Sequence, residues 1–245
     1  MSLPPLLLVG CGRMGSAMLS GWREQGLAAS VAVDPAPDAA RMAGPDLTVV
    51  PDAASIPSGF APAAVVLAVK PQSAAEALPQ HARYAGQAVF LSIMAGRTIG
   101  GMRSLLGDSA AIVRAMPNTP AAVRQGVTVA CPGDGVSTPQ RVLCERLLQA
   151  IGVVAWVDDE ALLDPVTAVS GSGPAYVFLL AELMEKAALE QGIPPDLARL
   201  RRLSTVARTV RLAVYGFLAT SRLDVRAIAK LLTGGATRAA KSLAG

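Results

Sequence analysis

Val166–Tyr176 is a run of small and polar residues that stands directly before an apolar helical pattern. Pro174 suits the first helical turn, where a missing backbone N–H costs little. The four residues before it leave their backbone amides largely uncovered by side chains: Ser170, Gly171, Ser172 and Gly173. A helix N-terminus attracts anions, carboxylates included, because its free amides carry partial positive charge. The run predicts a carboxylate site, and the alternative is a tight helix entry that only closes a domain interface.

A glycine-rich motif, Gly10-Cys11-Gly12-Arg13-Met14-Gly15, follows the apolar residues 5–9 and opens a helical pattern. Gly10 would permit a tight turn and Gly12 would let the backbone approach a pyrophosphate. Gly15 would allow a helix to pack closely on a strand. Dinucleotide binding requires this strand–loop–helix context, so we expect all six residues to contribute to a cofactor site.

Asp34 closes the second expected strand, where an acidic residue can bond a ribose hydroxyl. Its negative charge would repel a 2′-phosphate, which favours NADH over NADPH. Arg41 is close enough in sequence to soften that preference.

Three loops follow apolar strands: Ala68–Gln72, Ser92–Gly96 and Met116–Pro120. In an open α/β sheet, ligands bind outside the carboxyl ends of the strands, so these loops are expected beside a nicotinamide. The cofactor contacts expected there are Ala68, Val69, Lys70, Pro71, Ala95 and Asn118. The alternatives are that Lys70 is a solvated loop lysine and that Met116–Pro120 is a rigid turn without a ligand.

These residues need a scaffold, and the sequence predicts an α/β fold. Strands are expected at 5–9, 31–34, 63–69, 88–93, 111–115, 126–130 and 153–157, and helices after Gly15 and at 141–151. Strands that alternate with helices indicate a parallel sheet. After Asp158 the pattern is helical only. We therefore expect a Rossmann dinucleotide-binding domain over 1–158 and a smaller all-helical domain over 159–245.

Composition restricts the classes of function. The chain is 52% apolar and 16% charged, and it has no apolar run long enough for a transmembrane helix. The N-terminus lacks the basic segment and cleavage site of a secretion signal. Three cysteines without a CxxC pair are typical of a reducing cytoplasm. His81 is the single histidine and is expected at the surface, so a histidine triad or multi-histidine metal site is excluded.

The net charge of +4 is unevenly distributed. Residues 196–245 hold ten Lys and Arg and two acidic residues, a net of +8, which leaves −4 for the rest. A basic tail can contact nucleic acid, but neither aromatic interleaving nor a recognition motif accompanies this one. Nucleic-acid and membrane partners are therefore not expected.

Five motifs together resemble pyrroline-5-carboxylate reductase: Val9–Gly15, Ala68–Gln72, Ser92–Gly96, Arg114–Pro120 and Val166–Tyr176. The resemblance is in order and covers residues 5 to about 195. It implies a Rossmann domain, a helical dimerisation and substrate domain, and a homodimer that often assembles further. It also implies a cytoplasmic enzyme that reduces the C=N bond of pyrroline-5-carboxylate to L-proline with NADPH or NADH, the last step of proline biosynthesis.

The same resemblance implies roles for residues of the helical domain. The amides around Ser170–Gly173 would lie in or near the substrate pocket, and Glu160 would also contact it. Gly234-Gly235-Ala236-Thr237 matches a second substrate loop of the family. Gly235 and Thr237 would then bind substrate, and the Thr237 hydroxyl would act catalytically beside the substrate nitrogen.

The C-terminal part departs from the family pattern. Leu232-Thr233 stands where the family has Ser-Pro, and arginines occupy positions where small packing residues are usual: Arg201, Arg202 and Arg208. The chain stops eight residues after Thr237, where the family continues with a long helix, so a shortened helical domain is expected.

Two rival functions are open at this point. A β-hydroxyacid dehydrogenase relative would need a catalytic lysine on the first helix of the second domain. Lys186 is the only lysine there and lies about three turns from the start of that helix, which argues against this rival. A dinucleotide-binding protein without catalysis is the other rival, and the altered C-terminal part is the feature that favours it.

Overall fold

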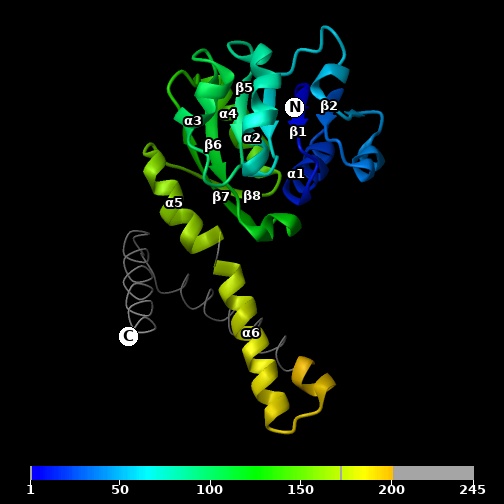
Figure 1. Ribbon diagram of the computed structural model, residues 1–245, viewed down its shortest axis with the longest axis vertical. Coiled ribbons are helices and arrows are strands. Elements are labelled where there is room, and N and C mark those ends of the chain that lie inside the picture. The colour runs from blue at the N-terminus through cyan, green and yellow to red at the C-terminus, as the bar shows by residue number, and fades with distance from the viewer. Residues whose placement is uncertain (1, 172, 201–245) are drawn as a thin grey trace. The chain divides into compact units, whose positions relative to one another are not determined.

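The computed structural model describes residues 2–171 and 173–200 (Figure 1). An eight-stranded sheet runs in the order β3-β2-β1-β4-β5-β6-β7-β8. The strands are β1 Leu6–Val9, β2 Ser30–Val33, β3 Leu47–Val50, β4 Ala64–Leu67, β5 Val89–Ser92, β6 Ala111–Met116, β7 Gly126–Pro132 and β8 Gly152–Trp156. Neighbouring strands are parallel except β6 and β7, which are antiparallel. The predicted α/β Rossmann fold is confirmed.

Helices and short turns connect the strands. The α-helices are α1 Arg13–Glu24, α2 Ala74–Ala77, α3 Ile99–Leu106, α4 Thr138–Gln149, α5 Leu163–Val166 and α6 Gly173–Glu190. The 3₁₀ turns are η1 Pro37–Met42, η2 Ala53–Ser55, η3 Pro71–Ser73, η4 Leu78–Tyr84, η5 Thr119–Val123 and η6 Glu160–Leu162. A π-helical turn, η7, covers Thr167–Gly171.

Two apolar cores cover the two faces of the sheet. Leu6 and Leu8 of β1 point into one core with α1 and α4, and Leu7 and Val9 point into the other with α2, η4 and α3. Because both faces are covered, all four residues of β1 are buried. This is the reason that the strand reads as a continuous apolar run and not as an alternating one.

Helix α1 lies tightly against its neighbours. A Cβ on Gly21 would come within 2.6 Å of the Ala150 carbonyl oxygen, so glycine permits the close approach of α1 to the end of α4. The buried Trp22 fixes the same contact, because its Nε1 donates to the Leu147 carbonyl at 2.9 Å. These contacts hold α1 in place under the glycine-rich loop.

The predicted strands all occur, and several elements were missed. β3 was not expected, and neither were α3 after the Ser92–Gly96 loop, the short helices α2 and α5, or the 3₁₀ turns. The one antiparallel pair has a simple cause. Only the short η5 turn joins β6 to β7, and a parallel crossover needs a dozen or more residues.

The surface placement of His81 is wrong. His81 is 2% exposed and lies in the middle of η4. The flanking alanines and glutamines suggested a solvated stretch, but the 3₁₀ turn rotates His81 inward. Its Nδ1 has no hydrogen-bond partner among the residues that the structure describes.

Contacts within the chain divide it into two compact units, Met1–Thr167 and Ala168–Gly245. The first contains the whole sheet, together with η6 and α5. In the second, α6 carries many exposed apolar side chains: Tyr176, Val177, Phe178, Leu179, Leu180, Leu183, Met184 and Leu189. The expectation that no stretch is long and apolar enough to cross a membrane was wrong, because Glu160–Glu190 is so by length and composition alone. An exposed apolar patch of this kind marks an interaction surface.

We expect acid to destabilise the protein through His81. Burial, and secondarily Arg83, lower the pKa of His81 to about 4, below its ordinary value near 6.5. The unfolded chain therefore binds a proton between these values while the folded chain does not, and stability falls as pH falls through that window. Urea unfolding near pH 7.5 and near pH 5 should show about 2 kcal/mol of loss from this group.

The His81→Leu variant is the matched control, because it keeps an apolar side chain of similar size and removes the titration. Its unfolding free energy should change less between the two pH values. An equal loss in the variant and the parent would contradict the assignment to His81.

Candidate active site

The glycine-rich loop lies at the point where the strand order reverses, between β1 and β4. Gly10 has a φ of +99°, and a Cβ there would be 2.8 Å from the Ala68 carbonyl group. A Cβ on Gly15 would collide with the Gly10 carbonyl oxygen. Glycine is therefore required at both positions by the packing of α1 on β1 and β4. Open α/β sheets bind their ligands at such a switch point.

Gly12 is different, because nothing in its own surroundings requires glycine. Its φ is −63°, and a Cβ built there meets no atom within 4 Å. Gly12 is also the N-cap of α1, with no side-chain cap and no acidic residue in the first turn. The loop thus offers open space beside uncapped helix amides, which fits a pyrophosphate.

Asp34 braces this loop from the end of β2. Its Oδ2 accepts from the Cys11 backbone N–H at 2.6 Å, and its Oδ1 accepts from the Ala36 N–H at 2.8 Å. Burial and the Asp34 charge raise the pKa of the Cys11 thiol to about 11, so Cys11 remains a thiol. Arg41 forms an exposed ion pair with Asp38 at 3.3 Å.

A pocket of about 360 Å³ opens at the carboxyl ends of β1, β2 and β4. Apolar residues form most of its wall, and polar groups enter from η2, α2 and η4. Its lining comprises Val9, Val33, Pro35, Pro51, Asp52, Ala53, Val69, Ser73, Glu76, Ala77, Gln80 and His81. The size and the mixed lining are typical of a small-molecule site.

The loops after β4, β5 and β6 are fastened to one another and to the sheet. Arg97 donates from Nε and Nη2 to the Pro71 carbonyl at 2.9 and 2.6 Å, and so joins the loops after β4 and β5. Asn118 Oδ1 accepts from the Val127 N–H at 2.9 Å, which holds the loop after β6 against β7. Lys70 and Ala95 are exposed at this edge.

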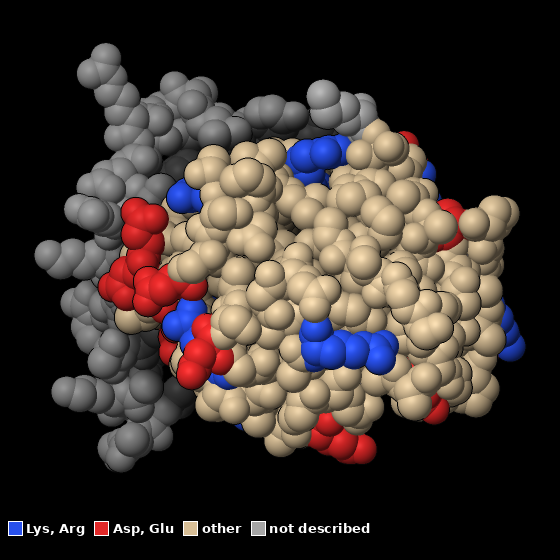
Figure 2. All heavy atoms as spheres, turned by 90° about the horizontal axis from the view of Figure 1, so that it is seen from above, with Lys and Arg blue, Asp and Glu red and all other residues tan. Residues whose placement is uncertain are grey.

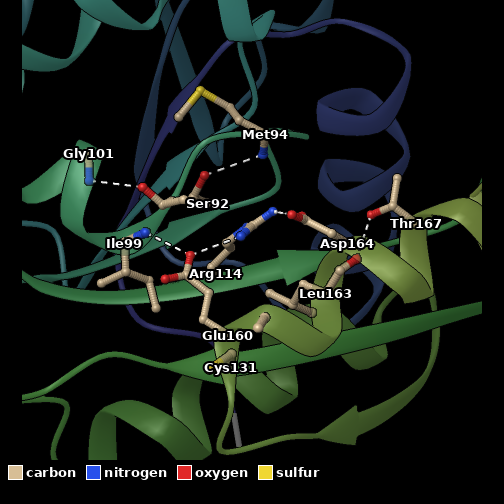
Figure 3. A network of polar contacts seen from close by, with 12 residues as sticks. Ser92, Met94, Ile99, Gly101, Arg114, Cys131, Glu160, Leu163, Asp164 and Thr167 are labelled. Carbon is tan, nitrogen blue, oxygen red and sulfur yellow. Dashed lines mark hydrogen bonds and ion pairs between the residues drawn. The ribbon is translucent and has the colours of Figure 1, made fainter.

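Glu160 lies in a partly buried polar network around the buried Arg114 (Figure 3). Its Oε1 accepts from Arg114 Nη1 at 2.9 Å and from the Ile99 backbone N–H at 2.8 Å. Arg114 also donates from Nη2 to Asp164 Oδ1 at 2.9 Å. In this structure Glu160 therefore bonds β6 and the start of α3.

The residues predicted to bind substrate are described in part. Ser170 and Gly171 belong to η7, and Gly173 is the first residue of α6. Ser172, Gly235 and Thr237 lie outside the described residues. Lys186 is an exposed residue of α6 and pairs with Glu190 at 4.0 Å.

Cysteine and metal chemistry find little support in the part of the chain that the structure describes. Cys11, Cys131 and Cys144 are free and buried, and burial raises the pKa of Cys144 to about 12. Buried thiols of this kind are inert. Among residues 2–171 and 173–200, no group of three or more His, Cys, Asp or Glu residues could hold a metal ion.

Two arginines of this site were missed from the sequence. Arg97 follows the Ser92–Gly96 motif, and Arg114 was noted only as part of a motif. The signal for Arg114 was available, because a charged residue within the apolar strand Ala111–Met116 must find a buried partner.

Comparison with known proteins agrees with this geometry. Residues 160–242 match the family described as pyrroline-5-carboxylate reductase dimerisation, and residues 6–96 match the one described as NADP oxidoreductase, coenzyme F420-dependent. The pyrroline-5-carboxylate reductase of Pseudomonas aeruginosa is 37% identical over 219 residues, which are 87% of this chain and 80% of that protein. The chain belongs to the pyrroline-5-carboxylate reductase family.

Other relatives and solved structures bear the same name. The pyrroline-5-carboxylate reductase of Haemophilus influenzae is 35% identical over 79% of this chain and 72% of that protein. The structure of the Coxiella burnetii reductase has a TM-score of 0.76 and 26% identity, over 98% of this chain and 91% of that one. The Plasmodium falciparum reductase, solved with NADP bound, has a TM-score of 0.71 and 25% identity, over 92% and 83%.

We expect the Gly12→Val variant to lose dinucleotide binding and keep its fold. The space beside the Gly12 Cα is open, so a larger side chain is tolerated by the protein but would enter the volume beside the helix amides. Fluorescence titration with NADPH and thermal unfolding measure the two properties.

Gly100→Ala serves as the control, because Gly100 in α3 also has no atom within 4 Å of its Cβ position. It should bind NADPH as the parent does. Retained NADPH affinity in Gly12→Val would contradict the assignment of this loop.

Proposed function

We propose that this protein reduces the C=N bond of pyrroline-5-carboxylate to L-proline, with NADPH or NADH as hydride donor. The 37% identity to a curated reductase over most of the chain carries the proposal. The second support is local, since Gly12 has open space beside the uncapped start of α1. Together they support a dinucleotide-dependent reductase of the last step of proline biosynthesis.

The first unit would hold the cofactor. The motif from Gly10 to Gly15 would receive the pyrophosphate, Asp34 would face a ribose, and the pocket near His81 would receive the adenosine end. Lys70, Ala95 and Asn118 would lie by the nicotinamide, which supplies the hydride when bound. The fastened loops keep this edge in place without a ligand, which limits the ordering that binding must cost.

The substrate would be held by its carboxylate. In this proposal the backbone amides of the small residues from Ser170 to Gly173 would receive the carboxylate. Ser170 and Gly171 lie in η7, within the helical stretch Glu160–Glu190. Gly235 and Thr237 would complete the pocket, with the Thr237 hydroxyl bonded to the substrate nitrogen. Glu160 would act near this pocket from its place in η6.

The helical part would also form a homodimer. The match of residues 160–242 to a dimerisation family supports this, and so does the exposed apolar surface of α6. In this proposal the chain divides into a Rossmann domain, 1–158, and a helical dimerisation and substrate domain, 159–245. The three buried free cysteines are consistent with a cytoplasmic enzyme.

The direct test is turnover. Purified protein is mixed with pyrroline-5-carboxylate and either NADPH or NADH, and the loss of reduced-nicotinamide absorbance is followed. L-Proline is then identified as the product. NADPH binding without turnover would favour the alternative, a dinucleotide-binding member of the family that lacks catalysis.

We expect NADH to be preferred, and the balance to depend on two opposite charges. Asp34→Asn keeps an acceptor for the Cys11 N–H and removes the negative charge, so the ratio of kcat/KM for NADPH over NADH should rise about tenfold. Arg41→Ala should lower that ratio, since Arg41 is the nearby cation. Steady-state kinetics with both cofactors measure it, and an unchanged ratio in Asp34→Asn would contradict the role of Asp34.

Thr237→Ala should slow turnover more than it weakens cofactor binding. Loss of one hydrogen bond to the substrate nitrogen should cost about 1–3 kcal/mol in the transition state, or roughly tenfold to a hundredfold in rate. Thr237→Ser keeps the hydroxyl and should retain most activity. Lower thermal stability with unchanged turnover in Thr237→Ala would mean that Thr237 only caps a helix.

A further inference from the structure

Arg114 is a charged residue in the interior of the sheet. It lies on β6 between β5 and β7, and its side chain is 4% exposed. A guanidinium in this position must be paired, because it has lost its hydration. β6 leads directly into the loop Met116–Pro120, so whatever holds Arg114 also holds the base of that loop.

Both partners of Arg114 come from the segment where the chain leaves the sheet. Glu160 is the first residue of η6 and Asp164 belongs to α5 (Figure 3). The Glu160 side chain is 26% exposed and that of Asp164 is 74% exposed. The pair with Glu160 is therefore less screened by water, and we expect it to be the stronger contact.

Glu160 extends the network to a third segment. The oxygen that faces Arg114 also accepts from the Ile99 N–H, the first amide of α3 after the N-cap Thr98. The partial positive charge of a helix N-terminus favours a carboxylate at this place. One oxygen thus joins α3, which follows the Ser92–Gly96 loop, with β6 and with η6.

The segment that Arg114 holds continues along the chain to Ser170. Thr167 Oγ1 donates to the Leu163 carbonyl at 2.7 Å, so the residues after Asp164 stay in a regular turn. Leu163 itself is fully buried against the sheet. The start of α3 after the β5 loop, strand β6 before its loop, and the segment that leads to Ser170 are therefore all connected through one buried cation, Arg114.

We infer that Arg114 is a positioning residue for turnover: through Glu160 and Asp164 it holds η6 and α5, which lead along the chain toward the proposed substrate residues, in register with the loops after β5 and β6. This inference rests on the proposed function. It concerns the placement of substrate, so loss of Arg114 should affect the kinetics of pyrroline-5-carboxylate and leave the pocket at β1, β2 and β4 unchanged.

The test uses the full chain and four variants, of which two change Arg114 alone. Arg114→Met removes the cation and keeps a long apolar side chain, and Arg114→Lys keeps a cation that can hold one carboxylate. We expect Arg114→Met to lower kcat/KM for pyrroline-5-carboxylate at least tenfold, chiefly through KM, with the NADPH dissociation constant within threefold of the parent. Arg114→Lys should have a kcat/KM between those of Arg114→Met and the parent. If Arg114→Met does not fold, the same measurement on Arg114→Lys tests the inference.

Arg23→Met is the matched control. Arg23 forms a half-buried pair with Asp46 at 2.8 Å, at the edge of the sheet opposite to the glycine-rich loop. The Arg23→Met variant should be less stable than the parent and should keep the parent's kcat and KM. Hydrogen exchange gives a readout that does not depend on activity, since the Ile99 amide should exchange faster in Arg114→Met and not in Arg23→Met.

The double variant Arg114→Met/Glu160→Gln separates two roles of Glu160. If Glu160 acts through Arg114, the double variant should be no worse than Arg114→Met alone. Arg114 variants that fold and turn over with the parent's KM and kcat would overturn the inference, as would a loss of NADPH affinity equal to the loss in KM. Absence of turnover in the parent would refute the proposed function and this inference together.

Discussion

The close approach of α1 to the sheet is the constraint on which the rest of this structure depends. Gly10 and Gly15 leave no room for a side chain between the loop, the end of β4 and the first turn of the helix. Gly21 and Trp22 fasten the other half of α1 to α4. Because the helix is held at both ends, its uncapped N-terminus stays aimed at the open space beside Gly12. We propose that an anion binds here to backbone amides at the start of α1.

The carboxyl edge of the sheet is held together by a few polar contacts. Asp34 bonds the glycine-rich loop, Arg97 joins the loops after β4 and β5, and Asn118 holds the loop after β6 to β7. Through Glu160, Arg114 of β6 is joined to η6 and to the start of α3. Figure 2 shows a surface with acidic side chains gathered on one side and large areas without charge. The charged contacts described at this edge brace the scaffold, and in the proposed function backbone groups would bind the ligand.

Helix α6 does not have the burial of the helices in the first unit. Its apolar side chains are largely exposed, which a stable monomer of this composition would rarely leave open. Residues 160–242 match a dimerisation family, and a dimer contact would cover these apolar side chains. The stretch Glu160–Glu190 is also apolar enough to cross a membrane. Its composition alone therefore does not distinguish a helix that contacts lipid from one that contacts a protein partner.

The sequence by itself determined the first strand, the glycine-rich loop and the helix that follows it. It also determined the positions of the main strands and the family. Those features are local, since a glycine at a tight turn or a continuous apolar run can be recognised without knowing its neighbours. Only the tertiary structure decided that His81 is buried, that β7 runs antiparallel and that Asp34 bonds the Cys11 amide. It also decided that Arg114 meets Glu160, because that pairing joins residues far apart in the chain and depends on how η6 and α5, which follow β8, return to pack against β6 and β7. Burial and long-range charge pairing are properties of the packed chain, and a single sequence carries only the requirement that a buried charge must have a partner.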